Sequence, residues 1–224
     1  MNIAKTNSDA NSHVRYPLSK SIADKSIALT CLIVLSPLFA IILIAMGLNM
    51  LFRPEDRGKW LFRDRRISNG KEFDILKFRI LRQGFYSTPP PDDLPFSIYE
   101  KESENLTWVG RYLIKPWYLD ELPQLLNILK GDMSLVGPRP WPVSMVNQQL
   151  EEGYDYRNRI RGGWTGLNQL RKSEHVLGDP FLVEADLEYL DHCANYPWWR
   201  LLLFDLRVVY KTIFVMFESK GLKN

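Results

Sequence analysis

The sequence is poor in the residues that build disulfide scaffolds and metal clusters. It has two cysteines, Cys31 and Cys193, and three histidines without metal-ligand spacing, which excludes a multi-cysteine zinc site. Neither a GxGxxG nor a GxxxxGK[ST] motif is present, so dinucleotide-binding and P-loop folds are poor candidates. A net charge of +3 argues against a dedicated nucleic-acid-binding protein. The 224 residues, 46% hydrophobic and 25% charged, suit one folded domain and exclude a disordered or fibrous chain.

One uncharged segment, Ser26 to Phe52, is long enough to enter a membrane, which takes about 20 apolar residues to cross. Hydropathy alone favours an ordinary single-pass helix. Two features favour a re-entrant helix instead: Ser36-Pro37 should break the run near its middle, and basic residues flank both ends, as expected if both ends stay cytoplasmic. We predict a flexible N-terminus over residues 1–20 and a re-entrant membrane helix over residues 21–53.

The remaining chain, residues 54–219, is predicted to form one small folded unit of strands and helices on the cytoplasmic side, which makes the whole protein α+β. Alternating apolar and charged residues from Gly58 to Arg82 predict a hairpin that turns at Ser68-Asn69-Gly70. The proline-rich segment Thr88 to Pro95 predicts a loop. From Leu119 the sequence predicts a short helix that stops at Gly131.

The C-terminal segment from Trp198 to Ser219 predicts a long amphipathic helix. Its charged residues fall on one narrow stripe, which comprises Arg200, Arg207, Lys211 and Glu218. Such a helix lies either in the membrane interface or in the core of the domain. Asp205 is off this stripe among apolar neighbours, and a carboxylate there requires a partner.

Asp120 and Glu121 open the short helix, where acidic residues usually serve only as caps. If Asp120 is the N-cap, Pro123 has no N–H to donate and the capping carboxylate loses one partner. A half-capped carboxylate would be stabilised as the anion, yet free to bind a metal or attack phosphorus. Glu121 points about 100° away, so the two side chains would serve different partners.

Two further groups of basic residues are candidates for phosphate binding. Arg139 lies between Pro138 and Pro140, and this stiff backbone favours a bidentate grip on phosphate, although an exposed loop arginine is the simpler interpretation. The turn at Gly131 could bring it toward Glu121. The alternating arginines from Tyr154 to Arg161 predict either an anion cradle or a basic strand facing water or lipid headgroups.

The block LDELPQLLNILKGDMSLVGPRP (Leu119–Pro140), with Lys77-Phe78-Arg79 before it and GGWTGLNQL (Gly162–Leu170) after it, resembles the bacterial sugar transferase family. These are monotopic polyprenyl-phosphate phosphoglycosyl transferases. The resemblance implies transfer of a sugar-1-phosphate from a UDP-sugar to undecaprenyl phosphate at the cytoplasmic face of the bacterial inner membrane, with release of UMP. It also implies Mg²⁺ as the cofactor, membrane lipid as a partner, and a re-entrant helix broken at the Ser-Pro pair, here Ser36-Pro37.

The resemblance also implies roles for particular side chains. Asp120 would be the nucleophile that attacks the sugar-linked phosphorus, and Glu121 would assist through Mg²⁺ or proton handling, so both are candidate metal ligands. Together with the basic segment, it marks a larger set as candidates for substrate or phosphate binding: Lys77, Arg79, Arg139, Arg157, Arg161, Arg171, Asp186, Tyr189 and Asp205.

The sequence departs from the family's pattern at several positions. Asp64 stands where the family commonly has glutamine, the stretch that ends at Tyr118 is one residue longer, and Arg171-Lys172-Ser173 replaces Asn-Gly-Arg. These changes affect phosphate and sugar recognition more than the nucleophile, and they leave the sugar open. They motivate one alternative, a non-catalytic membrane-anchored scaffold that recruits downstream glycosyltransferases. A metal-dependent phosphatase acting on lipids is a further alternative.

Overall fold

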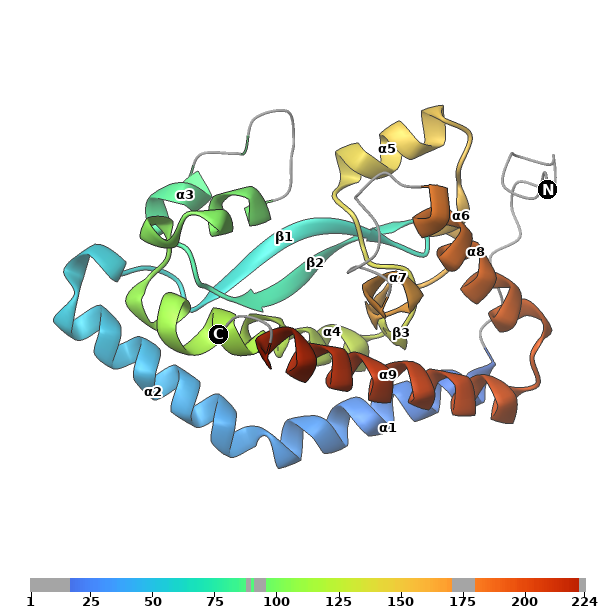
Figure 1. Ribbon diagram of the computed structural model, residues 1–224, viewed down its shortest axis with the longest axis horizontal. Helices are drawn as coiled ribbons and strands as arrows, with labels where there is room; N and C mark the ends of the chain where they lie inside the picture. The colour runs from blue at the N-terminus through green and yellow to red at the C-terminus, as the bar shows by residue number, and fades with distance from the viewer. Residues whose placement is uncertain (1–16, 88–89, 91–95, 171–179, 222–224) are drawn as a thin grey trace.

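The computed structural model describes residues 17–87, 90, 96–170 and 180–221, and it has the mixed α+β architecture that the sequence predicts. Two long helices near the N-terminus lie along one side, below a β-hairpin (Figure 1). The α-helices are α1 (Leu18–Val34), α2 (Ser36–Phe52), α3 (Gln83–Ser87), α4 (Gln124–Lys130), α5 (Val143–Glu151), α6 (Tyr156–Arg159), α7 (Leu167–Leu170), α8 (Pro180–Asn195) and α9 (Trp198–Gly221). The strands are β1 (Leu61–Ser68), β2 (Lys71–Phe78), β3 (Ser134–Val136) and β4 (Gly163–Thr165).

Short 3₁₀ or π-helical turns connect these elements and supply part of the site. They are η1 (Pro54–Asp56), η3 (Phe96–Lys101), η4 (Ser103–Asn105), η5 (Gly110–Ile114), η6 (Lys115–Trp117) and η7 (Leu119–Glu121). The predicted loop from Thr88 to Pro95 lies outside the described residues, except for Pro90. The predicted site residue Arg171 also lies outside them.

The predicted hairpin is confirmed, including its turn. Strands β1 and β2 pair antiparallel from Leu61 opposite Phe78 to Ser68 opposite Lys71. Asn69 and Gly70 form the two-residue turn, with φ of 51° and 70°, the positive values that such a hairpin turn needs and that Asn-Gly adopts readily. A second, parallel pair joins β3 to β4.

The predicted break at Ser36-Pro37 is confirmed, because α1 and α2 meet there with a bend of 58°. Pro37 has no N–H and so cannot donate to the carbonyl of Ile33, four residues earlier. The Ser36 hydroxyl donates to that carbonyl at 2.8 Å. The Ile33 carbonyl, which loses its helical donor because of the proline, is therefore hydrogen-bonded by Ser36.

The hydrophobic core has two clusters, and helix α4 lies between β2 and α1 (Figure 1). Helix α1 contributes to the first cluster, whose buried members include Ala28, Leu125, Ile128, Val136, Tyr189 and Leu201. Helix α2 contributes to the second, whose buried members include Ile42, Met46, Phe78, Leu106, Val109 and Leu122. Each half of the bent pair thus packs on a different part of the domain.

Within the described residues, no single helix has the length and hydropathy to cross a membrane, whereas the bent pair of α1 and α2 taken together has them. Several of their apolar side chains are at least 62% exposed, namely Ile33, Val34, Ile44, Leu51 and Phe52. Exposed apolar side chains in such number usually mark an interaction site. Membrane insertion of the pair remains a prediction.

The N-terminal boundary differs from the prediction, because α1 begins at Leu18 rather than after residue 20. Lys20 is only 5% exposed, and its ammonium group is 2.6 Å from Asp205 Oδ2 on α9. This long-range ion pair fixes the first turn of α1 to α9. It also supplies the partner that the sequence requires for Asp205.

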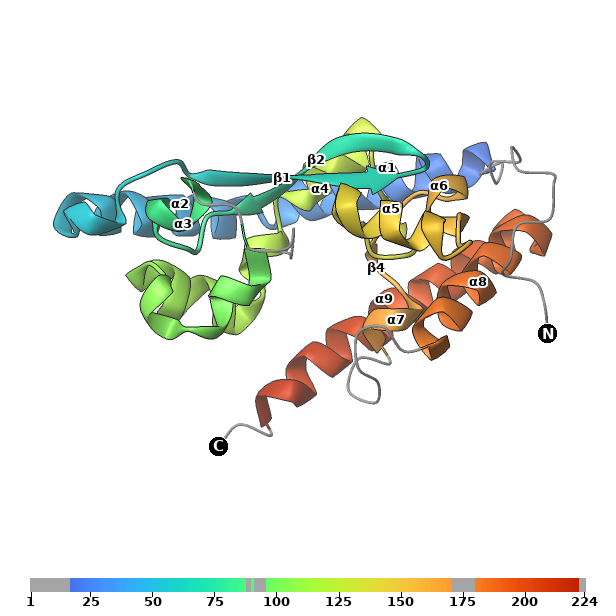
Figure 2. The same ribbon diagram turned by 90° about the horizontal axis from the view of Figure 1, so that it is seen from above.

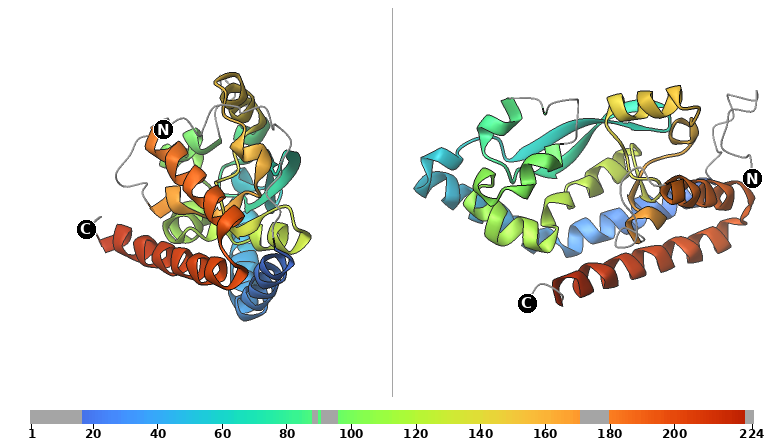
Figure 3. Two further views of the ribbon diagram at one scale, coloured as in Figure 1. Left: turned by 90° about the vertical axis from the view of Figure 1, so that its right-hand side faces the viewer. Right: turned by 45° about the horizontal axis from the view of Figure 1, so that its top comes forward.

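Helix α9 confirms the predicted C-terminal helix and packs beside α1 (Figure 3). It is buried on one side only: Leu201, Asp205 and Val208 are at most 4% exposed, whereas Leu203 and Tyr210 are 51% and 71% exposed. The C-terminal end of α9 points away from the rest of the molecule (Figure 2). Helix α9 is therefore half-buried: one side packs on the domain and the other side is exposed.

Candidate active site

Four charged side chains from three parts of the chain meet beside the hairpin. Lys77 lies near the end of β2, Asp120 and Glu121 lie in η7, and Arg139 lies in the loop after β3. Lys77 Nζ is 3.5 Å from Asp120 Oδ2 and 3.2 Å from Glu121 Oε1. Arg139 Nη2 is 2.8 Å from Glu121 Oε1, so the chain does fold Arg139 onto Glu121. We call these four residues the charged quartet.

The two adjacent carboxylates of the quartet differ in their charge behaviour. Burial raises the pKa of Asp120 to about 6, although the charge of Lys77 opposes this shift. Burial acts on Glu121 as well, but the charges of Arg139 and Lys77 and their hydrogen bonds overcome it and hold the pKa of Glu121 well below its usual range. Glu121 is therefore a fixed anion, whereas Asp120 changes protonation near neutral pH.

The local backbone corrects the predicted capping role of Asp120. Helix α4 begins at Gln124, with Pro123 in the cap position and no side-chain cap. A proline suits the start of a helix, where its missing N–H would have had no helical partner. Asp120 instead lies in the preceding turn, 7% exposed, and burial disfavours its anion. The predicted stop at Gly131 is confirmed by its φ of 92°.

Tyr118 turns the chain into η7 with a left-handed backbone. Its φ is 54°, which is uncommon for a residue with a side chain and costs about 1–3 kcal/mol where the surroundings enforce it. The stretch that ends here is one of those that depart from the family's pattern. The sequence does not predict this conformation, because position 118 has neither glycine nor asparagine, the residues that adopt a positive φ most readily.

The loop that carries Arg139 is fixed by a close approach of two backbones. A Cβ atom on Gly163 would lie 2.1 Å from the amide nitrogen of Gly137, and one on Gly137 would lie 2.6 Å from the carbonyl oxygen of Arg161. Only glycine permits this approach of β4 to the start of the loop. The Arg157 guanidinium then donates to the carbonyl oxygen of Arg139, which holds the loop from its other side.

The basic segment is not the basic strand that the sequence allowed, and an anion cradle there stays a prediction. Residues 156–159 form the short helix α6, which turns the alternating arginines in different directions. Arg157 is 6% exposed and pairs at 2.7 Å with Asp186, itself 2% exposed, while Arg159 pairs with Asp155. Arg157 and Asp186 therefore support the Arg139 loop and do not face the quartet.

Other predicted substrate-binding residues also take part in packing. The Arg79 guanidinium is buried and donates to the carbonyl oxygens of Asp56, Lys59 and Leu81. Arg161 donates to Ser21 on α1 at 3.0 Å, and the Tyr189 hydroxyl donates to Asp205 at 2.9 Å. The structure does not bring these side chains into the quartet, and their role in substrate binding stays a prediction.

Arg66 is a residue that the sequence reasoning missed as part of the site. Its side chain is 13% exposed and donates to Asp64 Oδ2 at 2.7 Å and to the Pro140 carbonyl at 3.4 Å. Charges of Arg139 and Glu121 both influence its pKa, which burial lowers. Alternation in β1 could have revealed it, because Asp64 and Arg66 share one face of the hairpin with Lys77, which lies opposite Phe62.

A buried carboxylate that ionises near neutral pH beside two fixed cations is suited to chemistry on phosphate groups. Comparison with known proteins agrees: the model of the bacterial sugar transferase family matches residues 15–219. The chain belongs to this family.

Two similar proteins illustrate the family. The chain is 37% identical over 217 residues to the exopolysaccharide production protein ExoY of Sinorhizobium fredii, covering 91% of this chain and 88% of that protein. It is 31% identical over 211 residues to the UDP-glucose:undecaprenyl-phosphate glucose-1-phosphate transferase of Escherichia coli, covering 91% of this chain but 41% of that protein. This chain thus matches under half of the longer relative.

Proposed function

We propose that the protein transfers a sugar-1-phosphate from a UDP-sugar to undecaprenyl phosphate through a covalent intermediate on Asp120. Family membership and the names of the relatives support the general reaction. The observation that carries the assignment to Asp120 is its buried carboxylate, which ionises near pH 6 and is not used as a helix cap. The product would initiate assembly of a glycan such as an exopolysaccharide.

In the first step, a carboxylate oxygen of Asp120 attacks the sugar-linked phosphorus of the donor. A bond forms between this oxygen and phosphorus, and the bond from phosphorus to the oxygen bridging toward uridine breaks, so UMP leaves with the electron pair. Lys77 and Arg139 offset the negative charge that develops on the phosphoryl oxygens. Glu121 keeps both cations in place, because it stays ionised throughout.

In the second step, a phosphate oxygen of undecaprenyl phosphate attacks the same phosphorus. The bond to Asp120 breaks, which restores the carboxylate and releases a polyprenyl diphosphate sugar. The acceptor is a lipid, so the site has to lie close to a membrane surface. Insertion of α1 and α2 as a re-entrant pair at the bacterial inner membrane, with the domain on the cytoplasmic side, would place it there.

The donor set of the quartet fits Mg²⁺. Asp120 and Glu121 offer two carboxylates, and Mg²⁺ is commonly held by one or two carboxylates together with substrate phosphates. In the part of the chain that the structure describes, no cluster of three or more acidic, histidine or cysteine residues forms a complete protein cage. Mg²⁺ bound with the donor would neutralise diphosphate charge.

The experiment supplies the purified full chain, in a mild detergent, with undecaprenyl phosphate, Mg²⁺ and a panel of UDP-sugars. We expect release of UMP with at least one donor, and loss of release when a chelator removes the metal. With the acceptor omitted, mass spectrometry should find the sugar-phosphate adduct on the peptide containing Asp120. Release of UDP, or turnover without any adduct, would overturn the covalent mechanism.

The fall in activity at the acid side of the pH profile (the acid limb) should reflect protonation of Asp120. Because only its ionised form attacks phosphorus, kcat/KM should fall as the pH drops through about 6. The charge of Glu100 contributes to the raised pKa of Asp120, so Glu100→Gln should move the limb to lower pH. A profile that is flat down to pH 5, or a limb that Glu100→Gln moves upward, would contradict the assignment.

A further inference from the structure

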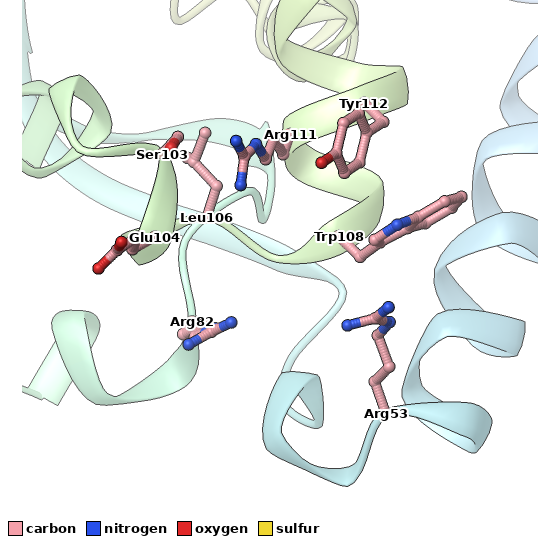
Figure 4. A pocket seen from close by; sticks show the side chains of 8 residues that line it. All are labelled: Arg53, Arg82, Ser103, Glu104, Leu106, Trp108, Arg111 and Tyr112. Carbon is pink, nitrogen blue, oxygen red and sulfur yellow. The ribbon is translucent and has the colours of Figure 1, made fainter.

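A second group of cations lies at the end of α2 and shares no residue with the charged quartet. It lines a cavity of about 430 Å³. Figure 4 shows Arg53, Arg82 and Arg111 reaching the same opening from three separate segments, with Trp108 and Tyr112 beside them. We call this the arginine pocket.

Three arginines and one glutamate are the charged residues that line the arginine pocket, and two of the arginines have carboxylate neighbours. Arg53 is 3.8 Å from Glu55 and Arg82 is 3.4 Å from Asp56. Among the residues that the structure describes, no carboxylate lies within ion-pair distance of Arg111, whose guanidinium is 5.2 Å from the Tyr112 ring. Glu104 is the one acidic residue among those that line the cavity. The pocket therefore suits an anionic ligand.

The walls of the pocket are held together by a buried carboxylate. Asp56 is 1% exposed and accepts hydrogen bonds from the Trp108 amide at 2.9 Å and from the Asn49 side chain at 3.1 Å. With its contact to Arg82, this joins α2, η1 and the segment before η5. The three arginines are thus presented by a fixed frame rather than by a loose loop.

The position of the pocket indicates the source of the anion. The last turns of α2 expose Leu48, Leu51 and Phe52 at 50%, 63% and 77%, and Arg53 follows directly. Trp108 and Tyr112 are half exposed beside it. Apolar residues that lead into aromatic and then basic side chains are typical of a membrane–water interface, where cations meet the phosphates of the lipids.

We propose that the arginine pocket binds the phosphate-bearing headgroup of an anionic membrane phospholipid and so fixes the end of α2 at the interface. This rests on the membrane insertion that the proposed function includes. The pocket and the quartet have no side chain in common, so lipid binding can be tested separately from turnover.

The test uses the full chain in nanodiscs or mixed micelles of phosphatidylcholine with and without phosphatidylglycerol, with bound lipid counted by native mass spectrometry. The wild type should retain phosphatidylglycerol in preference to phosphatidylcholine. Arg111→Gln and Arg53→Gln should each lower that retention about fivefold, as expected for one basic residue at an anionic surface. Arg63→Gln is the matched control, because Arg63 is an exposed arginine of β1 outside the pocket.

Each other outcome is informative. Equal loss in Arg63→Gln and in the pocket variants would overturn the proposal, since it would indicate nonspecific charge attraction. Displacement of the lipid by inorganic phosphate or UMP would assign the pocket to a soluble ligand and also overturn it. Asp120→Asn should keep the lipid preference; if it does while the wild type releases no UMP with any donor, the proposed reaction fails and the lipid site stands.

Discussion

Replacing Asp120 by asparagine should abolish turnover and at the same time stabilise the fold. Asparagine has nearly the same shape but cannot form the acyl phosphate bond, so we expect UMP release to fall on the order of 10³-fold or more. The adduct should be absent. Retention of turnover by Asp120→Asn would remove Asp120 from the role of nucleophile.

The stability gain follows from the sign of the pKa shift. The pKa of Asp120 is raised in the folded state, to about 6, so ionisation at neutral pH favours the unfolded chain. At pH 7 the neutral asparagine should therefore raise the free energy of unfolding by about 1–3 kcal/mol. The gain should shrink as the pH falls toward 4, where the carboxyl group is protonated in the folded state and increasingly so in the unfolded state.

Glu121→Gln is the matched control for this measurement, because the neighbouring carboxylate has the opposite shift. Its lowered folded-state pKa means that its charge stabilises the protein above its unfolded pKa, and this contribution is lost as the pH falls through the folded value. Glu121→Gln should therefore lower the stability at pH 7. If thermal unfolding shows both variants moving in the same direction, burial is not the source of the Asp120 shift.

Local sequence signals were sufficient for the features that depend on neighbouring residues. The break at Ser36-Pro37, the Asn69-Gly70 turn and the stop at Gly131 each follow from the conformational limits of one or two residues. The charged quartet was also accessible, through the family resemblance of the segments that carry it. These features need little knowledge of how distant parts of the chain pack.

The roles of the other charged residues could not be predicted in this way, because distant partners decide them. Arg157 in sequence resembles a ligand-binding arginine, yet a carboxylate 29 residues away makes it a buried support for the Arg139 loop. Arg79 follows the last residue of β2 and turns toward carbonyl groups instead of staying beside Lys77. The spacing of residues in the sequence shows where a charged side chain is, but it does not show which distant group that side chain will contact in the fold.

The strongest case of this kind is the buried cluster around Lys20, which ties the N-terminal helix to the rest of the domain. The ammonium group lies 2.6 Å from Asp205 and 3.4 Å from Asp24. Asp24 also accepts a hydrogen bond of 2.6 Å from Ser134 in β3, and Tyr189 in α8 donates to Asp205. One lysine thus holds together elements that come from α1, β3, α8 and α9.

Lys20→Met should lower the free energy of unfolding by about 3–5 kcal/mol, because it leaves two buried carboxylates without their cation. Lys25→Met is the control, since Lys25 is an exposed lysine of the same helix, and its loss should change stability by at most about 0.5 kcal/mol. Adding Asp205→Asn to Lys20→Met should recover part of the loss, because the second change removes one of the uncompensated charges. Denaturant unfolding in a mild detergent measures all three variants. Equal effects of Lys20→Met and Lys25→Met, with no recovery in the double variant, would show that the cluster does not stabilise the fold.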